Sequence, residues 1–181
     1  MKAKINTRRL FFALWPTDQI RSIIADKFSQ LQINPQGRVI RPRNLHITLH
    51  FLGQVTDQQR CCMHEAALSV AEHSFQLQLD YFDHFPKAKV FWMGVKCVPT
   101  KLVRLHQSLG SALEKCGFKS DVRPFFPHVT LMRKCHIPQT ELNTDQFAPA
   151  IPWQVHDFVL VESISDGREV NYQVIEKYPL S

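Results

Sequence analysis

The sequence predicts an α+β fold of two pseudo-symmetric lobes, each an antiparallel sheet with helices outside, with a cleft between them. A strand–helix–strand unit occurs twice, over residues 8–52 and again over residues 89–133, which indicates a weak internal duplication. Both units end in a strand that carries the sequence His-x-Thr-x. The chain has 181 residues, 44% hydrophobic and 21% charged, which suits one globular domain. We therefore expect residues 1–181 to form a single domain of two interleaved lobes.

The first unit opens with a strand and a capped helix. Residues 8–15 carry bulky side chains on both faces, which is typical of a buried strand, and Pro16 ends it. Thr17 is placed to cap the helix that follows. The apolar residues of this helix recur at helical spacing: Ile20, Ile23, Ile24 and Phe28. Residues 32–44 are rich in Pro and Gly, which predicts a loop with a short extended piece at 38–41.

A strand over residues 45–52 carries the first His-x-Thr-x sequence. Alternate residues of a strand share a face. The face toward the core is expected to hold Leu45, Ile47, Leu49 and Phe51. The opposite face is expected to hold His46, Thr48, His50 and Leu52. A second helix should follow Thr56, because Thr56 and Gln59 have the spacing of a capping box.

The second half repeats this order. Strands are predicted over residues 75–81, 89–95, 126–133, 154–162 and 172–177, and a helix over residues 100–116. Gly117 suits the C-terminal end of that helix. Its apolar side is formed by Leu102, Leu105, Leu109 and Leu113. The strand over residues 126–133 carries the second His-x-Thr-x sequence, so the duplication places both motifs on equivalent strands.

Charge and cysteine content limit the classes of partner and compartment. Lys plus Arg (22) exceed Asp plus Glu (16), giving a net charge of +6, which favours nucleic acid or a phosphorylated ligand. The five cysteines include no Cys-x-x-Cys pair, which argues against a disulfide framework or structural zinc and for a reducing compartment. The apolar run at residues 10–15 is too short for a signal peptide or membrane span. We expect a cytoplasmic monomer without a membrane or an obligate protein partner.

The two motifs supply the groups needed for phosphate-ester chemistry. They are His46-Ile47-Thr48-Leu49 and His128-Val129-Thr130-Leu131. On a strand, each places an imidazole and a hydroxyl on one face. Two such faces across a cleft would provide a general acid, a general base and two hydrogen-bond donors, with no cofactor. A core position would instead demand buried hydrogen-bond partners for these polar groups.

A metal site is the competing interpretation, because His46 and His50 are four residues apart. That spacing forms a ligand pair on a helix, but on a strand it separates the imidazoles by roughly 13 Å. No His-Glu-x-x-His sequence is present either. We therefore expect no bound metal, and we expect His50 at the rim of the same cleft.

These segments resemble the 2H phosphoesterase superfamily, and within it the bacterial RNA 2′,3′-cyclic phosphodiesterase branch, also called 2′-5′ RNA ligase. The likeness covers nearly the whole chain and rests on residues 9–14, 41–49, 51–53, 123–125, 127–133, 167–172 and 179–180. It implies an active-site cleft between the lobes. The implied reaction opens a 2′,3′-cyclic phosphate at an RNA 3′ end and leaves a 2′-phosphate, so the implied partner is RNA with that terminus.

The resemblance also implies roles for the motif residues. His46 would donate a proton to the leaving 3′ oxygen, and His128 would activate water. Thr48 and Thr130 would donate hydrogen bonds to the phosphate oxygens, where charge accumulates. The residues alone leave open which imidazole is the acid. They also leave open reversible 2′-5′ ligation, in which a ribose hydroxyl replaces water.

Two further site residues are implied by the resemblance: Arg133 near the phosphate and Phe12 as a stacking surface for the terminal base. Arg133 has the opposite strand parity from His128, so the strand must end, bulge or twist for its side chain to reach the cleft. Phe12 has a core position as its alternative. Four arginines flank the motifs: Arg38, Arg41, Arg43 and Arg123. They either guide an RNA backbone or form a solvated rim.

A non-catalytic module that binds RNA ends is the alternative function. The same imidazoles and hydroxyls would then hold a phosphate without turning it over. The presence of both histidines favours an enzyme, because a general acid and a general base each need their own group.

Overall fold

The computed structural model describes residues 6–31, 36–119, 123–136, 150–165, 167 and 170–181. The strands in these ranges are β1 (Thr7–Leu14), β2 (Gln36–Val39), β3 (Ile47–Thr56), β4 (Phe75–Leu79), β5 (Tyr81–Phe85), β6 (Val90–Gly94), β7 (His128–His136), β8 (Ile151–Val155), β9 (Asp157–Ser165) and β10 (Val170–Pro179). The helices are α1 (Asp18–Ser29), α2 (Asp57–Leu68) and α3 (Thr100–Glu114), with a 3-10 turn η1 (Pro42–Asn44).

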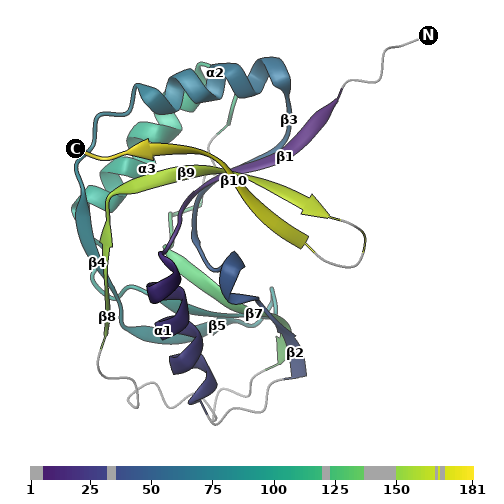
Figure 1. Ribbon diagram of the computed structural model, residues 1–181, viewed down its shortest axis with the longest axis vertical. Helices are drawn as coiled ribbons and strands as arrows, with labels where there is room; N and C mark the ends of the chain where they lie inside the picture. Colours follow the sequence, from purple (N-terminus) through teal and green to yellow (C-terminus); the bar gives the residue numbers. More distant parts are fainter. Residues whose placement is uncertain (1–5, 32–35, 120–122, 137–149, 166, 168–169) are drawn as a thin grey trace.

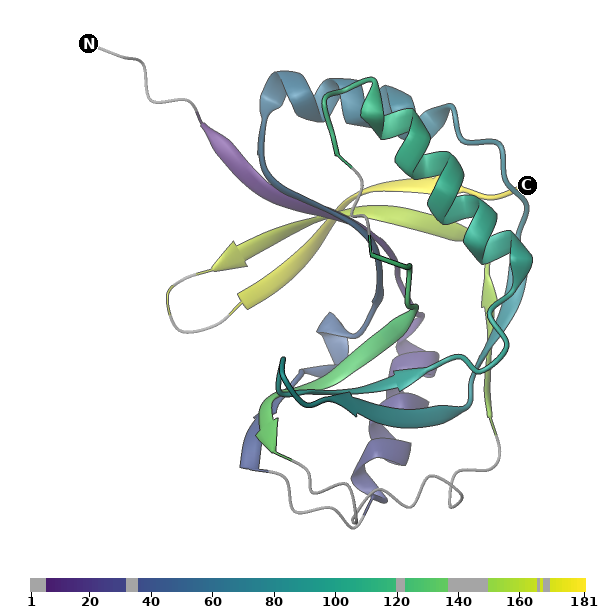
Figure 2. The same ribbon diagram turned by 180° about the vertical axis from the view of Figure 1, so that it is seen from behind.

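Most strands belong to one antiparallel sheet that bends into two lobes (Figures 1 and 2). One lobe holds β10, β9, β1 and β3 in that order, and the other holds β7, β6 and β5 with β2 paired to β7. The lobes meet where Ile47 of β3 pairs with Val129 of β7. Strands β4 and β8 form a separate two-stranded sheet. The predicted α+β class with antiparallel sheets is therefore confirmed.

Helices α1 and α3 are exchanged between the lobes. Helix α3 follows β6 but packs with α2 on the lobe of β1 and β3 (Figure 2). Helix α1 follows β1 but lies across the other lobe, where Phe28 contacts Phe91 of β6 with ring centroids 5.9 Å apart. One continuous hydrophobic core runs through both lobes as a result.

Local signals set the helix ends as expected. The Thr17 side chain caps α1 by accepting a hydrogen bond from the backbone N–H of Ile20. Thr56 and Gln59 form the predicted capping box of α2. Gly117 ends the turn after α3 with φ of +79°, a conformation that glycine adopts without steric cost. The buried side of α3 is the predicted one: Leu102, Leu105, Leu109 and Leu113.

Both motif strands contain a β-bulge directly after the motif threonine. In β3, Thr48 and His50 pair with consecutive residues of β1, so Leu49 is the extra residue. In β7, Thr130 and Met132 pair with consecutive residues of β6, so Leu131 is the extra residue. A bulge of one residue shifts the side-chain alternation of everything that follows it.

The bulges correct the predicted faces of β3. Phe51, expected in the core, has 64% of its surface exposed, whereas His50, expected at the rim, is only 5% exposed. The bulge at Leu49 exchanges their faces. The bulge in β7 likewise buries Met132 and leaves Arg133 exposed.

Two predicted strands are each divided in the structure. The strand predicted over residues 75–81 ends at Leu79, and β5 begins at Tyr81, a strand that was not predicted. The break falls at Asp80, whose backbone N–H donates to Gly94 and whose side chain accepts from the backbone of Lys96. The strand predicted over residues 154–162 is likewise β8 followed by β9, with His156 between them.

A disulfide bond links Cys62 of α2 to Cys116 beyond α3, with their Cα atoms 5.7 Å apart. The expectation from cysteine spacing is therefore wrong for this pair. The two residues are 54 positions apart, and only the packing of α2 beside α3 brings them together. In the described residues, no helix is long and apolar enough to cross a membrane, and no three His, Cys, Asp or Glu side chains form a group that could hold a metal ion.

The pairing of β3 with β7 yields a stability prediction. Ile47 is fully buried at the junction of the lobes. We expect Ile47→Ala to lower the free energy of unfolding by about 2–5 kcal/mol, because it removes three buried carbons and leaves a cavity. Ile47→Val should cost only about 0.5–1.5 kcal/mol. Urea unfolding followed by circular dichroism measures both, and equal losses for the two variants would show that the junction is not tightly packed.

Candidate active site

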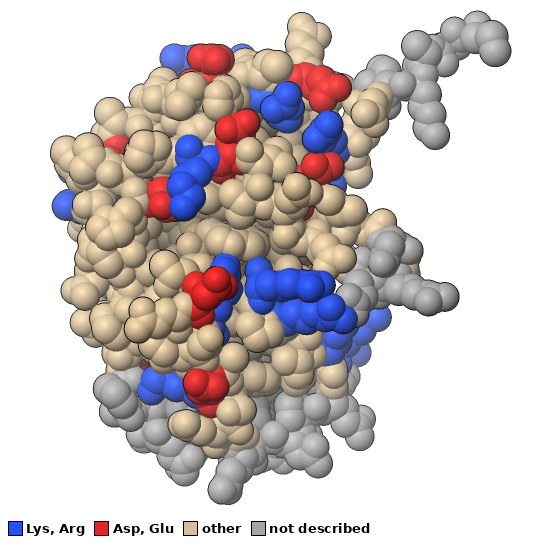
Figure 3. All heavy atoms as spheres, in the orientation of Figure 1, with Lys and Arg blue, Asp and Glu red and all other residues tan. Residues whose placement is uncertain are grey.

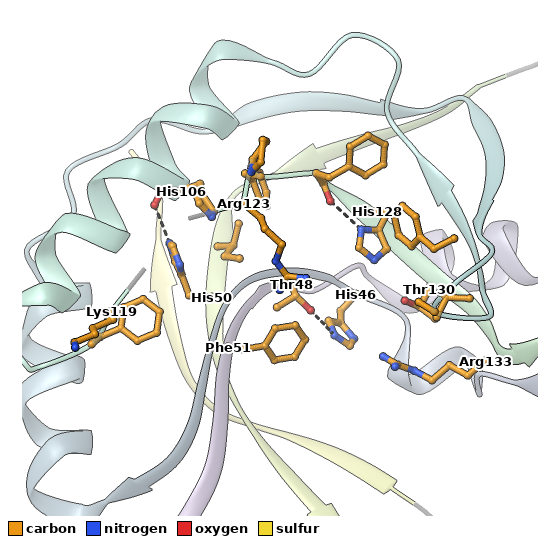
Figure 4. Close-up of a pocket in the computed structure, with 18 residues that line it drawn as sticks. His46, Thr48, His50, Phe51, His106, Lys119, Arg123, His128, Thr130 and Arg133 are labelled. Atoms are coloured by element: carbon orange, nitrogen blue, oxygen red, sulfur yellow. Dashed lines mark hydrogen bonds between the residues drawn. The ribbon is translucent and has the colours of Figure 1, made fainter. Parts of the chain in front are cut away.

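Both motifs face one cavity between the lobes, with a volume of about 810 Å³ (Figure 4). That volume lies within the range of small-molecule sites. The structure brings together five of the predicted site residues in its lining: His46, Thr48, His128, Thr130 and Arg133. They come from β3 and β7, so the single pairing of Ile47 with Val129 sets their separation.

His46 is held by its backbone neighbour. Its Nδ1 lies 2.7 Å from the carbonyl oxygen of Asn44, and its Nε2 lies 3.1 Å from Oγ1 of Thr48. Because a carbonyl only accepts, Nδ1 carries the proton, and Nε2 accepts from the Thr48 hydroxyl. The Asn44 side chain in turn donates to the carbonyl of Val170 in β10, 3.0 Å away. A buried chain of hydrogen bonds thus fixes the orientation of the imidazole.

Aromatic rings surround His46 on the side away from the hydroxyl. Trp15 stacks on it with centroids 5.5 Å apart, and Phe11 and Tyr172 lie at 4.9 and 5.2 Å. The pKa of His46 is lowered to about 4, chiefly by this burial and to a smaller extent by the positive charge of Arg133. The unliganded cleft therefore holds His46 as a neutral imidazole at pH 7.

His128 is oriented in the same way. Its Nδ1 donates to the carbonyl of Phe126, two residues earlier, at 2.8 Å, as His46 does to Asn44. The rings of Phe85 and Trp92 lie 5.3 and 5.8 Å from it. Burial lowers the pKa of His128, and Arg133 adds to the effect. Each catalytic candidate therefore has Nδ1–H committed to the backbone, and its Nε2 is the nitrogen left for other partners, which for His46 is the Thr48 hydroxyl.

Arg133 reaches the cavity because of the bulge at Leu131. The bulge resolves the parity conflict seen in the sequence: His128, Thr130 and Arg133 all line the cavity. Figure 4 shows Arg133 beside Thr130 and close to His46. A guanidinium in this position suits a phosphate, since it offers several donors in a fixed plane.

Phe12 does not line the cavity. It is completely buried, with ring centroids 6.0 Å from Phe158 and 5.9 Å from Tyr178. This placement contradicts the predicted stacking role, because no face of the ring is left for a base. Phe51 lines the cavity instead. It lies five residues after His46, as Arg133 lies five residues after His128, and that shared spacing is the signal by which it could have been found.

The far end of the cavity holds residues that sequence spacing did not connect. His106 of α3 lies there beside His50, together with Phe118, Lys119 and Phe125. In Figure 4 these imidazoles lie on the opposite side of Thr48 from His128 and Arg133. The cavity is therefore longer than the space between the two motifs.

Basic residues extend from the cavity onto the surface. Arg123 lines the cavity. Three arginines in β2, in η1 and between them are exposed: Arg38, Arg43 and Arg41. Figure 3 shows a cluster of Lys and Arg over these elements. The Arg43 side chain donates to Asn171 of β10 at 2.6 Å, which ties η1 to the other lobe.

Comparisons with known proteins agree over most of the chain. The model of the 2′-5′ RNA ligase superfamily matches residues 16–167. The RNA 2′,3′-cyclic phosphodiesterase of Escherichia coli (strain K12) is 33% identical over 127 residues, covering 70% of this chain and 72% of that protein. The protein of that name from Methanocaldococcus jannaschii is 31% identical over 129 residues, covering 69% and 70%. The crystal structure of E. coli LigT complexed with 3′-AMP matches with a TM-score of 0.85 at 27% identity, covering 97% of this chain and 99% of that one.

Proposed function

Because the chain belongs to the 2′-5′ RNA ligase superfamily, we propose that it is an RNA 2′,3′-cyclic phosphodiesterase, which opens the cyclic phosphate at an RNA 3′ end to a 2′-phosphate. One observation carries the proposal. Two histidines with the same backbone hydrogen bond present Nε2 to one cavity, each with a motif threonine beside it. This is the arrangement that a two-histidine acid/base mechanism requires.

The proposed reaction transfers two protons around one displacement at phosphorus. His128 Nε2 takes a proton from water as the water oxygen attacks the phosphorus. The bond from phosphorus to the 3′ oxygen breaks, and His46 Nε2–H donates its proton to that oxygen. The products are a 2′-phosphate and a 3′-hydroxyl. Thr48, Thr130 and Arg133 donate to the non-bridging oxygens, on which charge accumulates. A ribose hydroxyl in place of water gives the 2′-5′ ligation direction.

His46 must take up a proton when the substrate binds. Burial lowers the pKa of His46 to about 4, so the unliganded acid is deprotonated at pH 7. A bound phosphate anion opposes this effect, because an adjacent negative charge favours the imidazolium. The stacked Trp15 ring also favours a cation on its face. Substrate binding thereby creates the acid that the reaction needs.

The substrate also needs contacts beyond its phosphate. We propose that Phe51 stacks on the terminal base, since it is the most exposed of the aromatic rings that line the cavity and lies beside Thr48 and His46. The exposed arginines of β2 and η1 would hold the RNA backbone without reading its sequence. An RNA substrate favours a cytoplasmic location, and the oxidation state of Cys62 and Cys116 in rapidly alkylated cells tests that location.

The histidine mechanism makes a direct prediction. Purified protein incubated in EDTA with a short RNA ending in a 2′,3′-cyclic phosphate should yield a 2′-phosphate, identified by phosphorus NMR. Replacing His46 or His128 with Ala should each lower kcat by about 10²–10⁴-fold, because each removes one proton-transfer group. RNA affinity should change little. Loss of turnover in EDTA would contradict the metal-free mechanism, and binding without turnover in the native protein would indicate the non-catalytic module.

The lowered pKa values predict the pH dependence. The acid must be protonated, and burial lowers the pKa of both histidines. As pH rises through the higher of these values, kcat/KM should fall, so its alkaline limb should lie below pH 6.5, the ordinary pKa of histidine. The limb of kcat should lie at higher pH, because bound phosphate raises the pKa of the acid. Steady-state rates measured from pH 4 to 9 locate both alkaline limbs. Alkaline limbs of kcat and kcat/KM at the same pH would contradict proton uptake on substrate binding.

Phe12 lies in the core and Phe51 lines the cavity, so their substitution should give two different phenotypes. Phe51→Ala should raise KM by roughly 10–100-fold, the value of one base–aromatic stack, and leave the melting temperature unchanged. Phe12→Leu should lower the melting temperature and leave KM unchanged, because Phe12 is a core residue. Steady-state kinetics and thermal unfolding of both variants separate the roles, and an unchanged KM in Phe51→Ala would remove Phe51 from the substrate site.

A further inference from the structure

The far end of the cavity contains two histidines that the proposed reaction does not use. His50 Nε2 lies 2.8 Å from the carbonyl oxygen of His106, and a ring N–H of His106 donates to the carbonyl of Leu49. Strand β3 and helix α3 are thus joined by two side chain to backbone hydrogen bonds that run in opposite directions. Each imidazole has one N–H committed to a carbonyl, which leaves its other nitrogen as an acceptor.

The two imidazoles belong to a stack of three rings. His50 and His106 are stacked with centroids 4.2 Å apart, and His106 lies 4.0 Å from Phe125. Phe118 meets His50 edge-on at 5.5 Å. Two imidazoles in such contact cannot both be charged without strong repulsion, and burial lowers the pKa of each. The stack therefore holds both rings neutral and oriented.

The two imidazoles at this end of the cavity suit the edge of a nucleobase, while Lys119 beside them supplies one positive charge. Neutral imidazoles that offer acceptors would repel phosphate oxygens and attract N–H groups. His50 and His46 lie toward opposite ends of the cavity, on either side of Thr48 in Figure 4. Phe51 lies between them in Figure 4, where it would support the base. His50 is a polar side chain 5% exposed that lines the cavity, as expected for a built recognition site.

We propose that His50 and His106 read the exocyclic amino group of the terminal base. The enzyme then prefers RNA ends in cytosine over uracil, and in adenine over hypoxanthine. Each pair has nearly the same shape. Cytosine and adenine carry an exocyclic amino donor where uracil and hypoxanthine carry a carbonyl acceptor, and the adjacent ring nitrogen changes from an acceptor to an N–H donor. A carbonyl placed against an imidazole acceptor leaves both unsatisfied, which penalises the wrong base more than a lost contact alone. This inference rests on the proposed phosphodiesterase activity.

The test compares four RNAs that differ only in the terminal base, each ending in a 2′,3′-cyclic phosphate. We expect kcat/KM for cytosine to exceed that for uracil by about tenfold, and adenine to exceed hypoxanthine similarly. This measurement needs no variant. Equal kcat/KM values would overturn the base-reading inference and leave the phosphodiesterase standing. Turnover of none of the four would overturn the phosphodiesterase itself, and the inference with it.

Two variants then assign the preference to the imidazoles. His50→Phe and His106→Phe keep a ring in the stack and remove its nitrogens, so the cytosine-to-uracil ratio should fall toward one. His156→Phe is the matched control, because His156 is exposed and does not line the cavity. It should keep the native ratio. A purely structural role for the stack would lower the rates for both bases equally and leave the ratio unchanged, which would overturn the inference.

Discussion

The pairing of Ile47 with Val129 determines the geometry of the whole cleft. Both residues are completely buried, and each is the middle residue of its His-x-Thr motif. Because neighbouring residues on a strand point to opposite faces, burying this pair turns both histidines and both threonines toward the same space. The distance between acid and base is therefore set by a backbone pairing, which is far stiffer than a contact between two flexible side chains.

The duplication extends further than the motifs. Both strands bulge at the residue after the threonine, so the residue five positions after each histidine returns to the cleft. One lobe places arginine there and the other places phenylalanine, so under the proposed function one lobe would bind the phosphate and the other would stack on the base. Position 50, buried by the same bulge, carries histidine where the equivalent position of the other lobe carries Met132. The two halves thus share a backbone and differ in the chemistry that they present.

Sequence patterns predicted the features that depend on neighbouring residues. The caps at Thr17 and Thr56 and the leucine side of α3 follow from spacing within one helix. The bulges do not follow from such spacing, because they arise from pairing with another strand. They account for the exposure of Phe51 and for the burial of His50. Cys62–Cys116 and the contact of His106 with His50 require α3 to cross to the opposite lobe, which spacing along the chain does not encode.

The exchange of helices has a consequence for how the protein is made. The sheet beside His46 needs β9 and β10, which lie more than a hundred residues later, and α1 needs β6 as its partner. Contacts of such high sequence separation form slowly, and the lobe of β1 and β3 lacks β9 and β10 until most of the chain has been synthesised. The growing chain therefore exposes apolar strands on the ribosome for a long time, and yield in cells should depend on chaperones more strongly than the stability of the finished protein suggests.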